Sequence, residues 1–311
     1  MRVSQDTRTI KKGEWFLAVK GEKYDGHDFI PEARWKGARG VLEVEELYEL
    51  VKRKLARLAP KVIAVTGSYG KTTTKEAIYK VLSSKFKVLR TLGNLNTPLG
   101  VALEIVNNLQ PRDKVFVAEV GMDRRGEIAE TGALIRPKIG VVTAVGEMHL
   151  EKLGTLENIK KAKSELLGSL PSGGLAILNY DDPNVSEISR VFKGRKIWYG
   201  LSEGAGIGPK DIKGLKFKLL GRANLSNALA AYAVGREFGV PREKIFEALE
   251  SMRPIRGRLN LLRGKNGAKI IDDSYNAGPR SVGEALDVLE ELPARRRIAI
   301  LGDMLELGKL E

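Results

Sequence analysis

The chain has 311 residues and a formal net charge of +14, with 42% hydrophobic residues, 30% charged residues and no Cys. This composition excludes disordered chains, disulfide frameworks, thiol nucleophiles and thiolate zinc sites. No stretch approaches the run of about eighteen apolar residues that a membrane span needs, and the lack of Cys favours a reducing, cytoplasmic compartment. The positive charge predicts an acidic partner: nucleic acid, an anionic membrane surface or a phosphorylated substrate.

The first residues, to about 59, indicate a small Gly-rich α/β unit. Glycines interrupt short apolar runs such as 15–19, and apolar residues recur at helical spacing over 44–58. Pro60 follows this predicted helix and marks the boundary of the unit.

From Lys61 onward, short β-branched runs alternate with helical stretches, which is typical of a parallel sheet covered by helices. We predict strands at 62–65, 115–120, 139–142, 175–178 and 197–199. We predict helices at 72–82, 99–109, 156–170, 224–238 and 242–252. A third α/β unit is expected to open near Arg258, with a strand at 269–272, a helix at 281–289 and a strand at 298–301.

The strongest local signal is a strand, a glycine loop and a helix start within residues 62–73. Gly67 and Gly70 allow backbone N–H groups to point at phosphate oxygens, Lys71 can reach the terminal phosphates, and the Thr72 hydroxyl can bind Mg²⁺. The first glycine of the common phosphate loop is absent, so this loop is a shorter variant. An ordinary Gly-rich turn is the alternative, but the strand and helix around the loop favour ATP.

Three further residues follow predicted strands or lie on a neighbouring helix. Glu119 ends the run 115–118, where a carboxylate could hold Mg²⁺, although a glutamate at a strand end is more often only solvated. His149 follows the strand at 139–142, and an isolated His is more often structural than a metal ligand. Lys163 belongs to a basic helix, a pattern that normally indicates a solvated face.

Together these residues resemble the Mur ligases, the ATP-dependent amide-forming enzymes of peptidoglycan precursor synthesis, and most closely the branch that adds D-alanyl-D-alanine. The resemblance covers nearly the whole chain. It rests on ordered motifs at 6–8, 25–29, 66–73, 93–100, 119–122, 126–128, 145–151, 162–165, 179–183, 272–276 and 301–308.

The resemblance implies an α/β fold with a central P-loop-type, mostly parallel sheet flanked by helices. It implies a small N-terminal α/β domain (1–59) for the UDP end of a nucleotide-sugar peptide and a central ATPase domain (60–257). Residues 258–311 would open a C-terminal Rossmann-like domain that closes over ATP. Family members continue past the motif at 301–308, so we expect this chain alone to bind ATP weakly and to ligate poorly.

The same resemblance implies individual roles. Residues implied in ATP binding are Thr66, Gly67, Ser68, Gly70, Lys71, Thr72, Thr73, Asn227, Asp273, Tyr275 and Asn276. Residues implied in substrate binding are Asp6, Thr7, Arg8, Gly26, His27, Asn94, Asn96 and Thr97. Residues implied in catalysis are Lys71, Glu119, His149, Lys163 and Arg258, with Arg258 reaching the phosphates. Two Mg²⁺ ions would be held by Thr72, Glu119, His149 and Lys163, the last as a carbamylated lysine. Ala223 stands where the family usually has His.

The implied partners are UDP-N-acetylmuramoyl-tripeptide and D-alanyl-D-alanine, with no nucleic acid, no membrane span and a monomeric state. A related ATP-dependent ligase, such as a folylpolyglutamate or cyanophycin synthetase, is the first alternative. The motifs at 6–8 and 25–27 favour the Mur ligases, because they belong to the nucleotide-sugar module. A nucleotide-dependent regulatory or nucleic-acid-binding protein is a distant third, because aromatic residues are only 6% of the chain.

Overall fold

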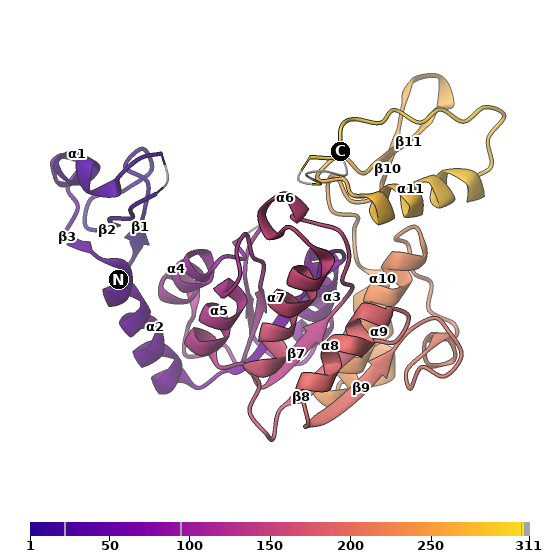
Figure 1. The fold of residues 1–311 in the computed structure, drawn as a ribbon, viewed down its shortest axis with the longest axis horizontal. Coiled ribbons are helices and arrows are strands. Elements are labelled where there is room, and N and C mark those ends of the chain that lie inside the picture. Colours follow the sequence, from indigo (N-terminus) through magenta and orange to yellow (C-terminus); the bar gives the residue numbers. More distant parts are fainter. Residues whose placement is uncertain (22, 94, 306, 308–311) are drawn as a thin grey trace.

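The structure, a computed structural model, describes residues 1–21, 23–93, 95–305 and 307 (Figure 1). Its centre is a six-stranded sheet in the order β5-β6-β4-β7-β8-β9, and every neighbouring pair is parallel. The strands are β4 Lys61–Thr66, β5 Val88–Arg90, β6 Val115–Glu119, β7 Ile139–Val142, β8 Leu175–Asn179 and β9 Arg195–Tyr199. Their carboxyl ends share one edge, where functional side chains of such sheets converge.

Helices cover both faces of this sheet. One face carries α3 Lys71–Ser83, α9 Arg222–Glu237 and α10 Arg242–Glu250. The other carries α4 Pro98–Asn108, α5 Glu127–Ile135, α7 Leu156–Gly168 and α8 Pro183–Ile188, with the short α6 Leu150–Leu153 beside α7. In β4, Ile63 and Val65 pack into the first layer while Val62 and Ala64 pack into the second. Burial on both faces explains the continuous apolar runs, and it confirms the predicted parallel sheet.

The N-terminal part forms a three-stranded parallel sheet in the order β1-β2-β3. Its elements are β1 Val3–Ser4, β2 Trp15–Leu17, α1 Ile30–Trp35 and β3 Gly40–Leu42. Helix α2 Val44–Leu58 then leads to the central sheet (Figure 1). It ends at Ala59, which adopts φ 44°, directly before Pro60.

The C-terminal part contains the antiparallel pair β10 Asn260–Arg263 and β11 Lys269–Asp272, followed by α11 Pro279–Glu291. The predicted strand at 298–301 is wrong. None of the described strands pairs with this segment, and Ile300 is 94% exposed. An extended apolar run becomes a strand only where a neighbouring backbone completes its hydrogen bonds, and β11 pairs here with β10.

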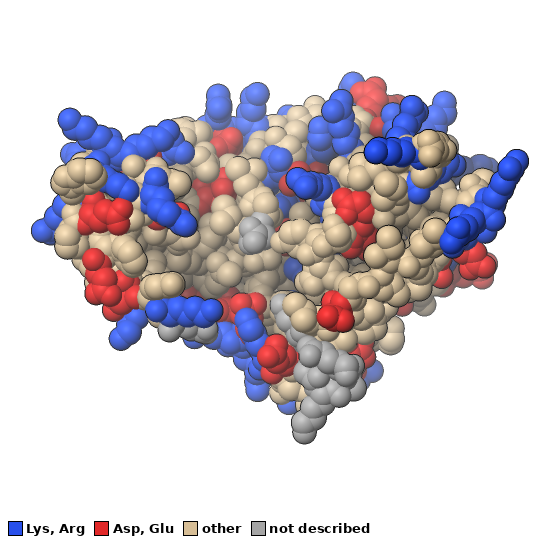
Figure 2. Space-filling view, turned by 90° about the horizontal axis from the view of Figure 1, so that it is seen from above, with Lys and Arg blue, Asp and Glu red and all other residues tan. Residues whose placement is uncertain are grey.

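Figure 2 shows Lys and Arg side chains spread around the rim of one face, with Asp and Glu between them. On this face they do not form a continuous basic stripe of the kind that typically binds a nucleic-acid backbone. Within the described ranges, no helix combines the length and apolarity needed to cross a bilayer.

Candidate active site

The loop between β4 and α3 has the backbone shape of a phosphate cradle. Gly67 adopts φ 149° and Gly70 adopts φ 79°. A Cβ on Gly67 would overlap the Thr143 hydroxyl, and one on Gly70 would lie 2.7 Å from Asn227 Oδ1. Both positions therefore require glycine, for backbone conformation and for space.

Residues that follow the neighbouring strands β6 and β7 hold this loop through hydrogen bonds. The Ser68 hydroxyl donates to Gly146 O at 2.9 Å and accepts from Gly146 N at 3.0 Å. The Thr143 hydroxyl donates to Tyr69 O at 2.5 Å, and Thr66 Oγ1 donates to Val120 O at 2.8 Å. These contacts with residues outside the loop fix its backbone, so the cradle is preorganised.

Lys71 is the first residue of α3, and its ammonium group folds back over the loop. Its Nζ donates to Gly67 O at 2.7 Å and to Ser68 O at 3.0 Å. Removal from water lowers the pKa of Lys71, nearby Glu119 opposes that shift, and Arg258 adds to it. The predicted role of Arg258 in reaching the phosphates stays a prediction.

Glu119, at the carboxyl end of β6, is the central carboxylate of the site and is 2% exposed. Its Oε1 accepts from Thr72 Oγ1 and from Asn96 Nδ2, both at 3.2 Å. Its Oε2 lies 3.3 Å from Lys75 Nζ, and Lys75 is fully buried. The alternative that Glu119 is only a solvated residue at a strand end is wrong, because its side chain is buried. The polar partners compensate for the removal of the carboxylate from water.

Lys75 is a member of this cluster that the sequence analysis missed. It lies one helical turn beyond Lys71, and a Lys on a helix gives no sign in the sequence that it is buried. Its buried ammonium group is paired with Glu119, which β6 brings beside it. The same group lies 3.6 Å from Glu76 Oε1 and donates to Gly93 O at 3.3 Å.

Lys163, on α7, is 1% exposed, so the prediction that it lies on a solvated helix face is also wrong. Its Nζ has no hydrogen-bond partner among the described residues. Burial holds the pKa of Lys163 well below its usual range; the positive charge of Lys71 lowers it further, while Glu165 and Glu119 raise it. Lys163 is therefore a buried amine that favours its neutral form.

His149 begins helix α6 with φ 61°, and its Nδ1 lies 4.0 Å from Asp123 Oδ1. No group of three or more His, Asp or Glu side chains in the described part of the chain has the arrangement of a metal site. The metal role of His149 stays a prediction.

The ATP-side residues of the C-terminal part lie together, where residues 258–259 meet the loop 273–276. Arg258 stacks on Tyr275, with Cζ 4.3 Å from the ring centre. Asp273 Oδ1 accepts from Leu259 N at 3.0 Å, and burial raises the pKa of Asp273. Asn276 belongs to the same exposed loop. The base- and ribose-binding roles of these residues stay predictions.

Asn227, on α9, lies directly beneath the phosphate loop. Its Oδ1 accepts from the Thr74 hydroxyl at 3.0 Å and lies against Gly70. Thr73, which precedes Thr74 in α3, is buried at 7% exposed. In this structure Asn227 supports the loop, and its predicted contact with adenine stays a prediction.

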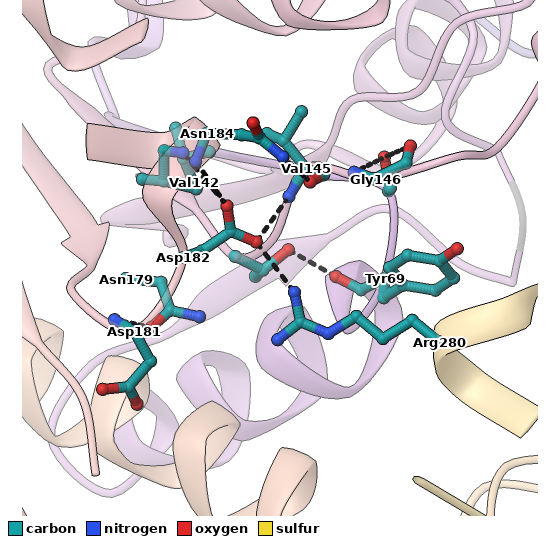
Figure 3. A network of polar contacts seen from close by, with 12 residues as sticks. Tyr69, Val142, Val145, Gly146, Asn179, Asp181, Asp182, Asn184 and Arg280 are labelled. Carbon is teal, nitrogen blue, oxygen red and sulfur yellow. Dashed lines mark hydrogen bonds and ion pairs between the residues drawn. The ribbon is translucent and has the colours of Figure 1, made fainter. Parts of the chain in front are cut away.

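Figure 3 shows a second network that the sequence analysis missed, in which α11 meets the central part. Arg280 NH1 lies 2.9 Å from Asp182 Oδ2, and the Asp182 side chain is 1% exposed. Asp182 also accepts from Val145 N at 3.1 Å and caps α8 through Asn184 N at 3.0 Å. The pair Asp182-Pro183 is a helix-start signal that could have revealed the cap, but nothing in the sequence reveals the partner Arg280.

The N-terminal motif residues make mostly local contacts. Asp6 accepts from Arg8 Nε at 2.9 Å, and Thr7 Oγ1 donates to Glu32 at 3.0 Å. His27 Nδ1 lies 2.5 Å from Asp25 Oδ1.

Gly26 closely approaches the segment after β2, because a Cβ would lie 2.5 Å from Val19 N. Thr97 caps α4 by accepting from Gly100 N at 3.2 Å. Asn94 lies outside the described residues.

Comparison with known proteins decides the family. Residues 65–235 match the Mur ligase middle domain, residues 257–311 the Mur ligase glutamate ligase domain, and residues 2–86 the Mur ligase family catalytic domain. The chain belongs to the Mur ligase family. As the sequence predicts, the architecture around the phosphate loop is that of a Mur ligase.

Relatives of this Mur ligase include UDP-N-acetylmuramoyl-tripeptide--D-alanyl-D-alanine ligases. The one from Bacillus subtilis is 33% identical over 99% of this chain and 74% of its own length. The one from Synechocystis is 36% identical over 98% of this chain and 73% of its own length.

Solved structures agree. MurF from Acinetobacter baumannii is 30% identical with a TM-score of 0.89, over 99% of this chain and 74% of that one. MurF ligase from Thermotoga maritima, solved in complex with ADP, is 29% identical with a TM-score of 0.85. The match covers 99% of this chain and 78% of that one.

Proposed function

We propose that this Mur ligase uses ATP to join D-alanyl-D-alanine to UDP-N-acetylmuramoyl-tripeptide in peptidoglycan precursor synthesis. The similarity to ligases of that name supports the substrates. The observation that carries the chemistry is the convergence of a preorganised phosphate loop with Thr72 and the buried Glu119 at one sheet edge. The protein would act in the cytoplasm as a monomer, without nucleic acid.

Domain roles follow the same division as the sequence analysis. Residues 1–59 would bind the UDP end of the donor substrate through Asp6, Thr7, Arg8, Gly26 and His27. Residues 60–257 would bind ATP, with Asn94, Asn96 and Thr97 near the peptide. Residues 258–311 would contribute Arg258, Asp273, Tyr275 and Asn276 to the nucleotide.

The reaction begins with the terminal carboxylate of the tripeptide, which is a poor acyl donor. One of its oxygens attacks the γ-phosphorus of ATP, ADP leaves, and an acyl phosphate forms. The amine of D-alanyl-D-alanine then attacks the acyl carbon, phosphate leaves, and the amine loses a proton as the amide forms. Anionic charge accumulates in both steps, and Lys71 with the loop N–H groups stabilises it.

The residues around Thr72 fit a Mg²⁺ ion. The Thr72 hydroxyl and the Glu119 carboxylate carry oxygens 3.2 Å apart that could bind the ion, and Glu119 Oε2 lies 3.3 Å from the Lys75 ammonium. His149 and a carbamylated Lys163 would contribute to a second ion. When bound, Mg²⁺ supplies positive charge that offsets the phosphate oxygens.

Carbamylation would give Lys163 a carboxylate-like end. The modification requires a neutral amine, and the lowered pKa of Lys163 provides one. Incubation with isotopically labelled bicarbonate should give a lysine carbamate carbon resonance in the native protein and none in Lys163→Ala. Lys163→Ala should lose ligation and recover part of it with added formate, whereas full activity in Lys163→Arg would contradict this role.

The decisive assay measures ADP release and product formation by the whole chain, at a protein concentration high enough to detect the slow turnover that the sequence analysis predicts for residues 1–311. We expect release to require ATP, Mg²⁺, UDP-N-acetylmuramoyl-tripeptide and D-alanyl-D-alanine together. ADP release stimulated only by polynucleotide would overturn the proposed function.

A further inference from the structure

The edge of the central sheet at which its strands begin is rich in cations. Six segments lead from a preceding helix to the first residue of a strand at this edge: 59–61, 84–88, 109–115, 136–139, 169–175 and 192–195. They contain one acidic residue, Asp113, which is buried. Their cations, all exposed, form a surface that we call the basic edge: Lys61, Lys85, Lys87, Arg112, Lys114, Arg136, Lys138, Lys193 and Arg195.

The cations of the basic edge form a broad array. Four of the segments carry two cations that are two residues apart, before β5, β6, β7 and β9. The strands begin side by side, since Lys61 N donates to Lys114 O and Lys114 N donates to Lys87 O, both at 2.9 Å. With about 4.8 Å between strands, the six strand starts extend over about 24 Å.

Most of this charge is not used within the fold. Lys61 lies over the Phe238 ring, Lys85 Nζ donates to the main chain after α9, and Arg195 pairs with Glu237. The side chains of the other six cations make no ion pair and no hydrogen bond with any residue that the structure describes. Their positive charge is therefore available to a partner outside the chain.

Stabilisation of helix ends is the simpler explanation for these cations, because a helix has partial negative charge at its carboxyl end. Helices α3, α4, α5 and α7 all end at the basic edge. The effect falls off within the last helical turn, however, and Lys87, Lys114 and Lys138 lie on the strand side of each segment. Helix ends alone do not account for these three cations.

The basic edge lacks the features with which proteins read nucleic acids. Single strands stack their bases on exposed aromatic rings, and duplexes are read by an element that enters a groove. Among the six described segments, no aromatic side chain is exposed, since Phe86 is half-buried and Phe192 is buried. Helices end at this edge instead of projecting from it. The array fits a flat anionic surface better than a nucleic acid.

We propose that the basic edge binds the protein to the surface of a bilayer that contains anionic lipids, through the phosphates of their headgroups. Each Lys or Arg near such a surface strengthens binding about fivefold. No large apolar side chain of the six segments is exposed, so binding is electrostatic and without insertion. This inference goes beyond the proposed function and does not depend on its substrates.

The position of the basic edge would leave the active site open to solution. In Figure 1 this edge lies at the bottom of the central part, while the N-terminal and C-terminal parts lie at the top. The phosphate loop follows the carboxyl end of β4, at the opposite edge of the sheet. A protein bound through the basic edge would therefore present its substrate sites away from the lipid.

Sedimentation with vesicles tests the proposal on the whole chain. The protein should bind vesicles of phosphatidylglycerol and phosphatidylcholine in equal parts, and it should not bind vesicles of phosphatidylcholine alone. Raising the salt concentration from about 0.1 M to about 1 M should release it, because the Debye length falls from about 10 Å to about 3 Å.

An edge variant with four substitutions removes cations that have no partner in the described part of the chain: Lys87→Gln, Arg112→Gln, Lys114→Gln and Lys138→Gln. It should bind anionic vesicles at least about a hundredfold more weakly than the unaltered protein. Its ligation rate without vesicles should be unchanged, because none of these residues lies in the candidate active site. Thermal unfolding checks that it folds.

The matched control removes the same charge from exposed residues of the N-terminal and C-terminal parts: Lys11→Gln, Lys12→Gln, Lys265→Gln and Lys269→Gln. It should bind anionic vesicles nearly as well as the unaltered protein. The comparison separates the effect of the basic edge from that of net charge.

The orientation of the bound protein gives a second reading. The chain contains no Cys, so a single introduced thiol can carry a fluorophore at a chosen place. Energy transfer to a labelled lipid headgroup should be strong from Ser172→Cys, in the exposed segment between α7 and β8. It should be weak from Gly283→Cys, which is exposed on α11 in the C-terminal part.

Several results would overturn the inference. Equal losses of vesicle binding in the edge and control variants would show that net charge alone attracts the protein. Undiminished binding by the edge variant would exclude the basic edge, and a lowered Tm would then assign its cations to the helix ends. Tighter binding to duplex DNA or RNA than to anionic vesicles at equal salt, lost in the edge variant, would assign the edge to nucleic acid. Ligation is measured without vesicles, so the proposed function is tested separately.

Discussion

At the scale of single residues, Lys71 is the cation of the phosphate loop that would stabilise negative charge on the phosphate oxygens. Its Nζ donates to Gly67 O and Ser68 O, and these hydrogen bonds hold the ammonium group over the loop. Replacing Lys71 by Ala should lower kcat on the order of a hundredfold or more, because charge developing in the transition state loses its cation. Steady-state ligation kinetics measure this, with the exposed Lys114→Ala as control, and a loss below tenfold would contradict the role.

His27 should make the folding stability of the N-terminal part depend on pH. Hydrogen bonds to Asp25 and then to Glu43 raise the pKa of His27 above 6.5. The folded state therefore holds the proton more tightly than the unfolded chain, so the stabilisation is complete below pH 6.5 and is lost as pH rises through the folded pKa. Denaturant unfolding should show His27→Gln destabilised relative to the unaltered protein at about pH 6 and less so at about pH 8. A difference independent of pH would refute this linkage.

At the scale of elements, α11 meets the loop 143–149 that braces the phosphate loop. Arg280 supplies the cation for the buried Asp182, which in turn holds Val145 N (Figure 3). The approach is close, since a Cβ on Gly278 would lie 2.8 Å from Met148 Sδ. Docking of the C-terminal part is thereby coupled to the floor of the active site.

Arg280→Gln should loosen this contact. Because the Arg280 side chain is 41% exposed, solvent screens the pair, and we expect a loss of only about 1 kcal/mol in unfolding free energy. The larger effect should be faster amide hydrogen exchange over 143–149 and a raised KM for ATP. Arg295→Gln, on the exposed segment after α11, is the control, and unchanged exchange in Arg280→Gln would exclude the coupling.

At the scale of the whole molecule, nucleotide binding between the central and C-terminal parts should stabilise the fold. ATP with Mg²⁺ at about a hundred times its Kd adds about 2.7 kcal/mol to the stability of a protein with one site. Scanning calorimetry should therefore show Tm raised by several degrees. Chelating Mg²⁺ with EDTA should reduce the shift, and Lys71→Ala should abolish most of it. An equal shift with adenosine alone would place the binding energy outside the phosphate loop.

The sequence predicts much of this architecture because local physics specifies it. Strands 62–65 and 139–142 are apolar on both faces, and the helix 44–58 shows helical periodicity and ends before a proline. Short elements such as β1 and β5 escaped prediction, because two or three residues carry no periodicity. The strand predicted at 298–301 failed because apolar sequence alone does not supply a pairing partner.

What the sequence determined by itself is the phosphate loop, the parallel sheet and the family resemblance, since these depend on backbone conformation and residue order along the chain. The tertiary structure decided which charged residues are buried. Lys75 looks like a solvated helix residue until β6 brings Glu119 beside it, and Lys163 does so until the fold buries its amine. Asp182 gains Arg280 only when α11 docks. Burial and pairing depend on contacts between distant segments, so no local pattern encodes them.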